Sequence, residues 1–354
     1  MTSIVKPPVR HPSLRQNSLG LTLRDYEGVM STLCAGCGHD SVTAALVQAA
    51  WELALEPHRA AKMSGIGCSS KTTAYFMKQS HGFNSVHGRM PSVTTGAAAA
   101  NRGLTYIGIS GDGDSLSIGI GQMAHAIRRN VDMLYVIENN GVYGLTKGQF
   151  SASADVGSTS KRGEANEQAP IDPVLLALSI GATFVARSFS GDKKQLVPIL
   201  KAGLAHKGLA LVDVISPCVT FNDHEGSTKS YKFTREHEVE AVHADYVPLH
   251  TEITLPDAAH GADPVRVVQM HDGSSVRLRA TAADYDPTDR TSAYAHVRAC
   301  QSRGEIATGL LFVDEQSRDM HDLLKTPETP LIDLPFERLC PGAAALDALM
   351  ARYR

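Results

Sequence analysis

The sequence alternates between short apolar runs and segments with helical periodicity. The runs with the length of buried strands are 63–67, 104–110, 133–137, 183–187 and 209–215. The segments with the pattern of helices are 41–55, 94–101, 117–129, 173–179 and 193–206. Strands that alternate with helices predict an α/β fold built on a doubly wound, mostly parallel sheet.

Clusters of Gly, Pro and polar residues mark the predicted boundaries between the parts of the chain. Residues 1–30 are expected to form an irregular N-terminal arm, 31–240 the main domain and 241–354 a C-terminal extension. Within the extension, 266–270 and 275–278 predict a hairpin around Asp272-Gly273, and the remaining Pro- and Asp-rich part is expected to wrap around the domain. The polar segment 151–169 is expected to be a loop.

Composition adds few constraints. The 354 residues are 43% hydrophobic and 20% charged, which is typical of a globular protein with a large core. A net charge of −3 gives no reason to expect a nucleic acid or a membrane surface as a partner. No apolar run approaches transmembrane length, and residues 1–16 lack the apolar centre of a signal peptide. Six cysteines with metal-like spacing fit a reducing compartment, so we expect a cytoplasmic protein.

The most informative motif is Gly111-Asp112-Gly113-Asp114, which directly follows a predicted strand. Glycines let the backbone turn sharply and approach a ligand closely, and Asp112 offers a hard carboxylate oxygen suited to Mg²⁺. The next predicted strand ends at Asn139-Asn140, whose amide oxygens are also hard ligands. A helix that begins after the first motif can face a phosphate with its N-terminus. These positions predict a divalent metal, held by Asp112, an Asn and a diphosphate.

Simpler interpretations fit less well. A lone Gly-Asp-Gly is usually only a turn. An EF-hand loop that starts at Asp112 would need an oxygen ligand where Leu116 lies. A dinucleotide fingerprint needs three correctly spaced glycines, and Ser115 to Ser117 interrupt that pattern. The paired motif resembles the diphosphate-binding half of thiamine diphosphate (ThDP) enzymes. That resemblance implies Mg²⁺ ligands from Asp112, Asn140 and the backbone carbonyl of Val142.

A second group of residues consists of cysteines: Cys34, Cys37, Cys68 and Cys218. Two thiolates separated by two residues can chelate one metal centre, and glycines keep the loop open. A zinc ribbon would need a second Cys-x-x-Cys, which is missing, and a redox dithiol normally opens a helix in a thioredoxin-like unit. Beside the ThDP motifs, a 4Fe–4S cluster is the better interpretation. Cys300 and Cys340 are expected to be ordinary thiols.

Together these features resemble the β subunit of 2-oxoacid:ferredoxin oxidoreductases over roughly residues 31 to 235. The matching motifs are Cys34-Ala-Gly-Cys37-Gly-His39, Gly65-Ile-Gly-Cys68-Ser-Ser-Lys71, His87-Gly-Arg89, Thr95-Gly96, Gly111-Asp-Gly-Asp114, Asn140-Gly-Val-Tyr-Gly-Leu-Thr-Lys-Gly-Gln149 and Pro217-Cys218. The alanine at position 35, where many relatives have proline, removes no ligand.

The resemblance implies reversible, CoA-dependent oxidative decarboxylation of a 2-oxoacid to acyl-CoA and CO₂. Electrons would pass singly through one 4Fe–4S cluster to ferredoxin, with ThDP and Mg²⁺ as the other cofactors. In this family the glutamate that activates ThDP lies on the pyrimidine-binding domain of an α chain. We therefore expect an obligate α/β complex, as α2β2 or a larger assembly, that is active only with its α partner.

Site residues follow from the same motifs. The residues expected to bind the cofactor are Gly111, Asp112, Gly113, Asp114, Asn140, Tyr143, Gly144, Leu145 and Lys71. The candidate catalytic residues are Lys147, Thr146, His87 and Arg89. For His87 and Arg89 a capped surface loop is the competing interpretation, and for Lys71 a solvated side chain. His39 is expected to support the site or cap a helix.

Substrate identity depends on weaker signals. The form of the segment from Asn140 to Gln149 resembles 2-oxoglutarate-type or broad-specificity enzymes, and Lys147 would suit a second carboxylate. Pyruvate or a broader set of 2-oxoacids is the alternative. Two other classes compete: a non-redox ThDP decarboxylase subunit, which would need no cluster, and a zinc-stabilised binding subunit, which would need no ThDP motifs.

Overall fold

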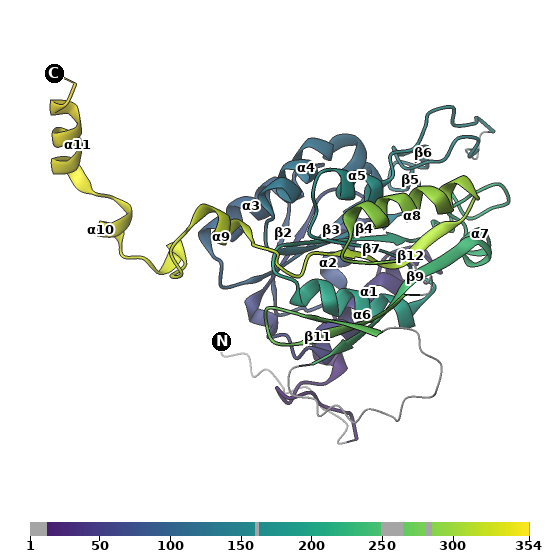
Figure 1. Cartoon of the computed structure of the whole chain (residues 1–354), viewed down its shortest axis with the longest axis horizontal. Coiled ribbons are helices and arrows are strands. Elements are labelled where there is room, and N and C mark those ends of the chain that lie inside the picture. The colour runs from purple at the N-terminus through teal and green to yellow at the C-terminus, as the bar shows by residue number, and fades with distance from the viewer. Residues whose placement is uncertain (1–12, 160–162, 249–264, 281–284, 354) are drawn as a thin grey trace, which may run out of the picture.

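A ten-stranded sheet runs through the structure, a computed structural model that describes residues 13–159, 163–248, 265–280 and 285–353 (Figure 1). Its strands, in order across the sheet, are β10 (Val265–Gln269), β11 (Ser275–Ala280), β9 (Glu238–Val247), β12 (Ile306–Val313), β7 (Phe184–Phe189), β8 (Leu209–Ile215), β4 (Met133–Asn139), β3 (Thr105–Gly111), β1 (Ala60–Ser64) and β2 (His81–Asn84). The six strands from β7 to β2 are parallel to one another, as the alternating pattern predicted.

Helices cover both faces of this sheet. One face carries α3 (Met90–Ala100), α4 (Ile120–Arg129), α5 (Pro173–Ser179) and α8 (Arg290–Ser302), and the other carries α1 (Gly38–Glu52) and α6 (Lys193–Ala205) (Figure 1). The central strands β4, β7 and β8 are buried along their whole length, because both of their faces are covered. The predicted doubly wound α/β fold is therefore confirmed.

Shorter elements connect these layers. They are η1 (Leu23–Tyr26), η2 (Pro57–Arg59), η3 (Ser69–Lys71), α2 (Thr72–Tyr75), β5 (Val142–Tyr143), β6 (Gln149–Phe150) and α7 (Tyr231–His237). The irregular arm expected at the N-terminus is tied to the domain where it is described: Tyr26 is buried, and Trp51 of α1 donates from its indole nitrogen to the Leu21 carbonyl at 3.0 Å. Residues 1–12 lie outside the described part of the chain.

Two predicted boundaries are wrong near the glycine motifs. The helix expected at 117–129 is divided into a π-helix, η4 (Gly113–Ile118), and α4, which begins at Ile120. The strand expected at 63–67 lies at 60–64, because the chain leaves β1 at Gly65, and Gly67 adopts a φ of +137°. Both differences occur where glycines release the backbone from regular structure.

The C-terminal part joins the same sheet. The predicted hairpin is confirmed, since β10 and β11 pair antiparallel with Val268 opposite Val276. β9 continues past residue 240, where the main domain was expected to end. β12 lies between β9 and β7 and is antiparallel to β7. The expectation that this part wraps around the domain is wrong for β9 and β12, because these two strands belong to the central sheet instead.

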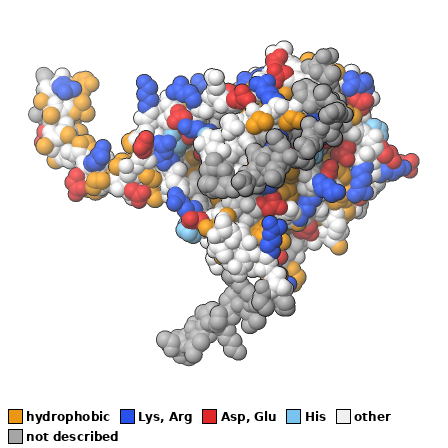
Figure 2. All heavy atoms as spheres, turned by 60° about the horizontal axis from the view of Figure 1, so that its bottom comes forward, with side chains coloured by type: hydrophobic (Ala, Val, Ile, Leu, Met, Phe, Trp, Pro, Cys, Tyr) orange, Lys and Arg blue, Asp and Glu red, His pale blue; other side chains and the backbone are white. Residues whose placement is uncertain are grey.

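The last residues extend away from the domain. After α9 (Met320–Leu324), the chain passes η5 (Leu331–Asp333), α10 (Phe336–Leu339) and α11 (Gly342–Ala351), which project to the left in Figure 1. Hydrophobic side chains gather on this arm (Figure 2), and Phe336 is 71% exposed. This arm does not wrap around the domain either. None of the helices in the described ranges has the length and apolar character that crossing a lipid bilayer requires.

Candidate active site

Strand β3, strand β4 and the loop after strand β1 deliver the predicted motifs to one small pocket of about 90 Å³. Predicted site residues in its lining are Cys68, His87, Gly111, Asp112, Gly113, Asp114, Asn140, Val142, Tyr143, Gly144, Leu145 and Thr146. The other lining residues are His39, Ile66, Gly67, Ser69 and Glu138. Because β3 and β4 are parallel neighbours, their carboxyl ends meet at one edge, where doubly wound sheets bind ligands.

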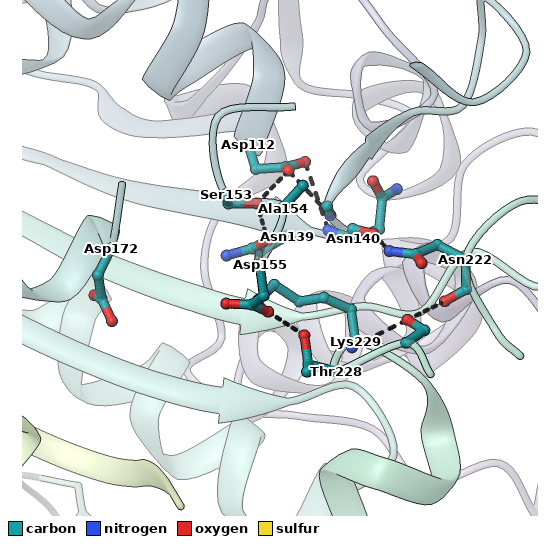
Figure 3. Close-up of polar contacts among 12 residues, drawn as sticks. Asp112, Asn139, Asn140, Ser153, Ala154, Asp155, Asp172, Asn222, Thr228 and Lys229 are labelled. Carbon is teal, nitrogen blue, oxygen red and sulfur yellow. Dashed lines mark hydrogen bonds and ion pairs between the residues drawn. The ribbon is translucent and has the colours of Figure 1, made fainter. Parts of the chain in front are cut away.

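Asp112 is almost fully buried, and hydrogen-bond donors surround its carboxylate (Figure 3). Its Oδ2 accepts from the Ser153 hydroxyl at 2.6 Å, from the Gly141 amide at 3.0 Å and from the Ser151 hydroxyl. Its Oδ1 has only a long contact, 3.5 Å from the Asn140 amide. One oxygen is thus fixed by the protein, and the other has room for an additional ligand.

Asn140 lies beside Asp112 at the end of β4 (Figure 3). Its Oδ1 accepts from the Val142 amide at 3.1 Å, and its backbone carbonyl accepts from Asn222 Nδ2 at 2.8 Å. The following Gly141 has a φ of +75°, a conformation that favours glycine. The turn that carries Asn140 and Val142 is therefore held from two sides.

Asp114 has a different environment from Asp112. Its Oδ1 accepts from the amides of Gly88 at 2.7 Å and Ile66 at 3.2 Å and contacts His87 Nδ1. Its Oδ2 accepts from the Ser110 hydroxyl at 2.6 Å. This carboxylate joins two loops, at Ile66 and at Gly88, to strand β3, so its bonds organise the pocket.

Gly144 brings the pocket next to the cysteines. A Cβ atom at this glycine would lie 3.5 Å from the sulfur of Cys68 and 3.7 Å from that of Cys218. Cys34 and Cys37 precede α1, and the Gly38 amide donates to the Pro217 carbonyl at 3.1 Å, beside Cys218. Cys68 and Cys218 therefore adjoin the pocket at Gly144, whereas Cys37 is buried just before α1 and Cys34 is exposed.

The thiols differ in exposure and electrostatics. Burial raises the pKa of Cys37 to about 12, and burial also raises the pKa of Cys68 and Cys218. Backbone hydrogen bonds from Phe221, Thr220 and Asn222 oppose that increase at Cys218. In the described part of the chain, no three His, Cys, Asp or Glu side chains converge to hold a single metal ion.

A buried acid and a buried base lie under the pocket, and the sequence did not single out the acid. Thr72 donates to both oxygens of Glu138 at 3.0 and 3.1 Å, and burial raises the pKa of Glu138 well above its usual value. Burial lowers the pKa of His39 to about 4. His39 Nδ1 lies 2.6 Å from the Ser216 hydroxyl, and its Nε2 lies 3.4 Å from Asn140 Nδ2. The expected supporting position of His39 thus agrees with its contacts.

Three of the predicted catalytic and cofactor-binding residues do not line this pocket. Arg89 is exposed, and its guanidinium donates to the Ile118 carbonyl and to Gln122 on α4. Lys147 is exposed on the turn after β5, with a φ of +80°. Lys71 ends η3, close enough to Cys68 for its charge to lower the pKa of that thiol. Thr146 lines the pocket and donates to Gln149 at 2.7 Å.

The residues present fit a diphosphate with a hard divalent cation. A carboxylate, an amide side chain and the backbone of the turn at Val142 supply oxygen donors within one pocket. Gly113 lies so close to the Tyr143 ring that any side chain would collide with it. Sequence reasoning missed Ser151, Ser153 and Asn222, which hold the motif from segments that carry no motif of their own.

Known proteins that resemble this chain include a family that binds thiamine pyrophosphate, as the donors in the pocket suggest. The family described as "Thiamine pyrophosphate enzyme, C-terminal TPP binding domain" matches residues 65–214. A 2-oxoacid:ferredoxin oxidoreductase subunit beta from Saccharolobus solfataricus is 42% identical over 208 residues, which are 58% of this chain and 68% of that protein. The 2-oxoglutarate oxidoreductase subunit KorB of Mycobacterium tuberculosis is 40% identical over 191 residues, 54% of this chain but only 51% of that protein.

A solved structure extends the likeness to almost the whole chain. It is a 2-oxoglutarate:ferredoxin oxidoreductase from Magnetococcus marinus with 2-oxoglutarate, coenzyme A and succinyl-CoA bound. The two structures share 27% sequence identity and superpose with a TM-score of 0.72, over 97% of this chain and 99% of the other. The two sequence relatives match 58% and 54% of this chain, whereas the structural likeness covers 97% of it.

Proposed function

This chain belongs to the family of 2-oxoacid:ferredoxin oxidoreductase β subunits, and from that membership we propose the reaction that it serves. With an α partner, it carries out reversible, CoA-dependent oxidative decarboxylation of a 2-oxoacid, with 2-oxoglutarate as the favoured substrate. The products are acyl-CoA and CO₂, and electrons leave through a 4Fe–4S cluster to ferredoxin. A broad-specificity or pyruvate enzyme is the alternative.

One observation carries this proposal: Asp112 and the turn at Asn140 meet in one pocket, and Cys68 and Cys218 adjoin it at Gly144. In the proposal, Asp112, Asn140 and the Val142 carbonyl hold Mg²⁺ against the diphosphate of ThDP. Cys34, Cys37, Cys68 and Cys218 hold the cluster. ThDP supplies an electron sink for decarboxylation, and the cluster accepts electrons singly.

The chain's own residues set the charge around these groups. Because burial lowers the pKa of His39 to about 4, its ring is neutral at physiological pH and adds no positive charge beneath the metal. Glu138, whose pKa is raised by burial, is bonded to Thr72. Asp112 and Asp114 are buried carboxylates in the pocket lining, and Lys71 offers the opposite charge near Cys68.

Exposed apolar side chains around the pocket support the need for a partner. Ile66 and Leu145 line the pocket and are partly exposed, as are Ile118 and Val86 on neighbouring segments. A rim of apolar side chains around a polar pocket is typical of a surface that another protein covers. We propose that the pyrimidine-binding domain of an α subunit covers it, in an α2β2 or larger cytoplasmic assembly. Residues 31–240 would be the cofactor-binding part.

The substrate preference rests on two supports. The mycobacterial relative KorB is named a 2-oxoglutarate oxidoreductase subunit, and the Magnetococcus structure contains 2-oxoglutarate. Lys147 is exposed on the turn beyond the pocket, where a partner subunit and substrate can reach it. The Saccharolobus relative carries the broader name 2-oxoacid, which supports the alternative.

One experiment tests the reaction class directly. The chain is purified anaerobically with its α partner, and its iron and acid-labile sulfide are measured together with its absorption spectrum. Reduction of a viologen is then assayed with 2-oxoglutarate, pyruvate and a branched 2-oxoacid, with and without CoA. Four irons and CoA-dependent reduction are expected. Decarboxylation without iron or viologen reduction would instead support a non-redox ThDP decarboxylase.

A further inference from the structure

We propose that Asn139 is a positioning residue for the metal site: its amide connects Ser153, which holds Asp112, to a buried ion pair in the centre of the sheet. The inference rests on the proposed function, because it takes Asp112 to be a metal ligand. Asn139 itself does not line the diphosphate pocket, so its effect would be transmitted through Ser153.

Both ends of the Asn139 side chain are used. Its Oδ1 accepts from the Ser153 hydroxyl at 2.8 Å (Figure 3), and its Nδ2 donates to Asp213 Oδ1 at 3.0 Å. Asn139 and Ser153 are each only 3% exposed. An amide with one acceptor and one donor fits these two neighbours in one orientation, because a reversed amide would turn its oxygen toward the Asp213 carboxylate.

Ser153 stands between two acceptors. Its hydroxyl lies 2.6 Å from Asp112 Oδ2 and 2.8 Å from Asn139 Oδ1, and a hydroxyl has one proton to donate. Ser151 also contacts Asp112 Oδ2, so the carboxylate keeps a hydroxyl donor when Ser153 donates to Asn139. With both acceptors in reach, the single proton is shared in a three-centre hydrogen bond, so Asn139 and Asp112 together fix the place of Ser153.

A buried ion pair anchors the other end. Asp213 Oδ2 accepts from Arg187 Nε at 2.7 Å, and Arg187 Nη2 donates to Asp172 Oδ1 at 2.7 Å. Asp213 is fully buried, and Arg187 is 6% exposed. Gln301 of α8 donates to the second oxygen of Asp172 at 2.7 Å. A buried charged group that is held by two carboxylates has few alternative positions, which supports Asn139 from the centre of the sheet.

The chain of bonds links four elements of the fold to one carboxylate oxygen. It starts on β7 and β8, passes through the end of β4, and reaches the loop at Ser153. Outer partners that orient metal ligands typically change metal affinity by about 10–100-fold when they are removed. Loss of the Asn139 amide is therefore expected to weaken Mg²⁺ binding, although Asn139 touches neither the metal nor the cofactor.

The test measures Mg²⁺ affinity in the α/β complex. After removal of metal and cofactor, Mg²⁺ is titrated calorimetrically in the presence of ThDP. Asn139→Ala is expected to raise the Mg²⁺ dissociation constant about 10–100-fold, and Ser153→Ala is expected to raise it as well. If Asn139 acts through Ser153, the double variant should bind Mg²⁺ no more weakly than Asn139→Ala alone, since the effects of substitutions at contacting residues are not additive.

A matched control separates positioning from stability. Asn130 is also buried, and its side chain makes hydrogen bonds with Ser317, Arg318, Thr183 and Leu209 at the opposite end of the same sheet. Asn130→Ala should lower the melting temperature but leave Mg²⁺ affinity unchanged. Should Asn139→Ala fail to fold, Ser153→Ala carries the test, because it removes a single oxygen.

The outcomes are distinguishable. Unchanged affinity in Asn139→Ala, or an additive double variant, overturns the positioning role. If affinity is lost in Asp112→Ala but kept in Asn139→Ala, only this inference fails. If the unmodified complex binds neither ThDP nor Mg²⁺, the proposed function itself fails.

Discussion

Asn139 and Asn140 are neighbours in the chain, but their side chains lie on opposite sides of the sheet edge. Asn140 lines the small pocket with Asp112, whereas Asn139 lines a separate cavity of about 670 Å³ together with Asp213 and Arg187. Successive residues of an extended chain point to opposite faces; Asn139 is the last residue of β4, and Asn140 directly follows it. The doubled asparagine therefore supplies one residue to the pocket and one to its support.

The first prediction concerns the carboxylate in the pocket. Asp112→Ala should abolish retention of ThDP, because the metal that neutralises the diphosphate loses a carboxylate ligand in a buried pocket. Calorimetry of the α/β complex with ThDP and Mg²⁺ measures this loss. The control is Asp333→Ala, which removes an exposed carboxylate from η5 and should bind normally. Unchanged affinity and Mg²⁺ dependence in Asp112→Ala would refute the ligand assignment.

The sequence predicted the edge of the sheet that forms the pocket because the decisive signals are local. Apolar runs mark β3 and β4, and each run ends at its own motif, so parallel pairing is enough to bring Asp112 and Asn140 together. The same reasoning placed Cys68 and Cys218, which also follow strands. What had to be assumed was only that these strands are neighbours, which the alternating pattern favours.

The supports of the pocket could not be predicted in the same way. Ser153 lies in a polar loop without periodicity, and its bond to Asp112 depends on how that loop folds back. Asp213 and Arg187 meet Asn139 only because β8 lies beside both β4 and β7. The position of β12 between β9 and β7 is likewise a matter of strand order, which local hydrophobic pattern does not encode.

The second prediction concerns the cluster. Replacing Cys34, Cys37, Cys68 or Cys218 singly by Ala should lower iron content and abolish electron transfer to a viologen, because a cluster that loses one thiolate loses a bond to iron. Iron and sulfide analysis of anaerobically purified protein measures the loss. Cys300 provides a matched control, since it is a buried thiol in α8, and Cys300→Ala should keep full iron content. Full iron and activity in Cys68→Ala would remove that residue from the ligand set.

The third prediction concerns pH and stability. Burial, with a smaller contribution from His271, lowers the pKa of His206 to about 3, whereas an unfolded histidine titrates near 6.5. The unfolded chain therefore binds the proton first, so stability is complete above about pH 6.5 and falls with pH below it. The His206 contribution should amount to a loss of about 1.5 kcal/mol between pH 6.5 and 5. Urea unfolding at several pH values measures the slope.

Replacement of the ring gives the control for that slope. His206→Gln keeps a polar group near Thr183, whose hydroxyl lies 2.8 Å from His206 Nε2, but removes the titration. The variant should lose less stability than the unmodified chain over the same pH interval. Equal slopes in the two proteins would mean that His206 is not held neutral by burial.

The fourth prediction concerns the C-terminal arm. Ending the chain after Pro330 removes η5, α10 and α11, in which no residue is buried, so the melting temperature of the chain should change by less than about 2 °C. Ending it after Ser317 also removes Asp319 and Met320, which are buried, and should destabilise the domain strongly. Differential scanning calorimetry compares the two truncations. A large loss of stability in the chain that ends after Pro330 would show that the arm packs against the domain.

The last prediction concerns substrate choice. If Lys147 meets the distal carboxylate of 2-oxoglutarate, Lys147→Met in the α/β complex should raise KM for 2-oxoglutarate about ten- to a hundredfold, because a charge-assisted hydrogen bond contributes roughly 1.5–3 kcal/mol. KM for pyruvate, which has no second carboxylate, should change little. Steady-state viologen reduction with both substrates measures the ratio. Lys193→Met removes an exposed lysine on α6 and should alter neither value. Equal losses on both substrates would assign Lys147 to the shared 2-oxoacid group, the cofactor or CoA.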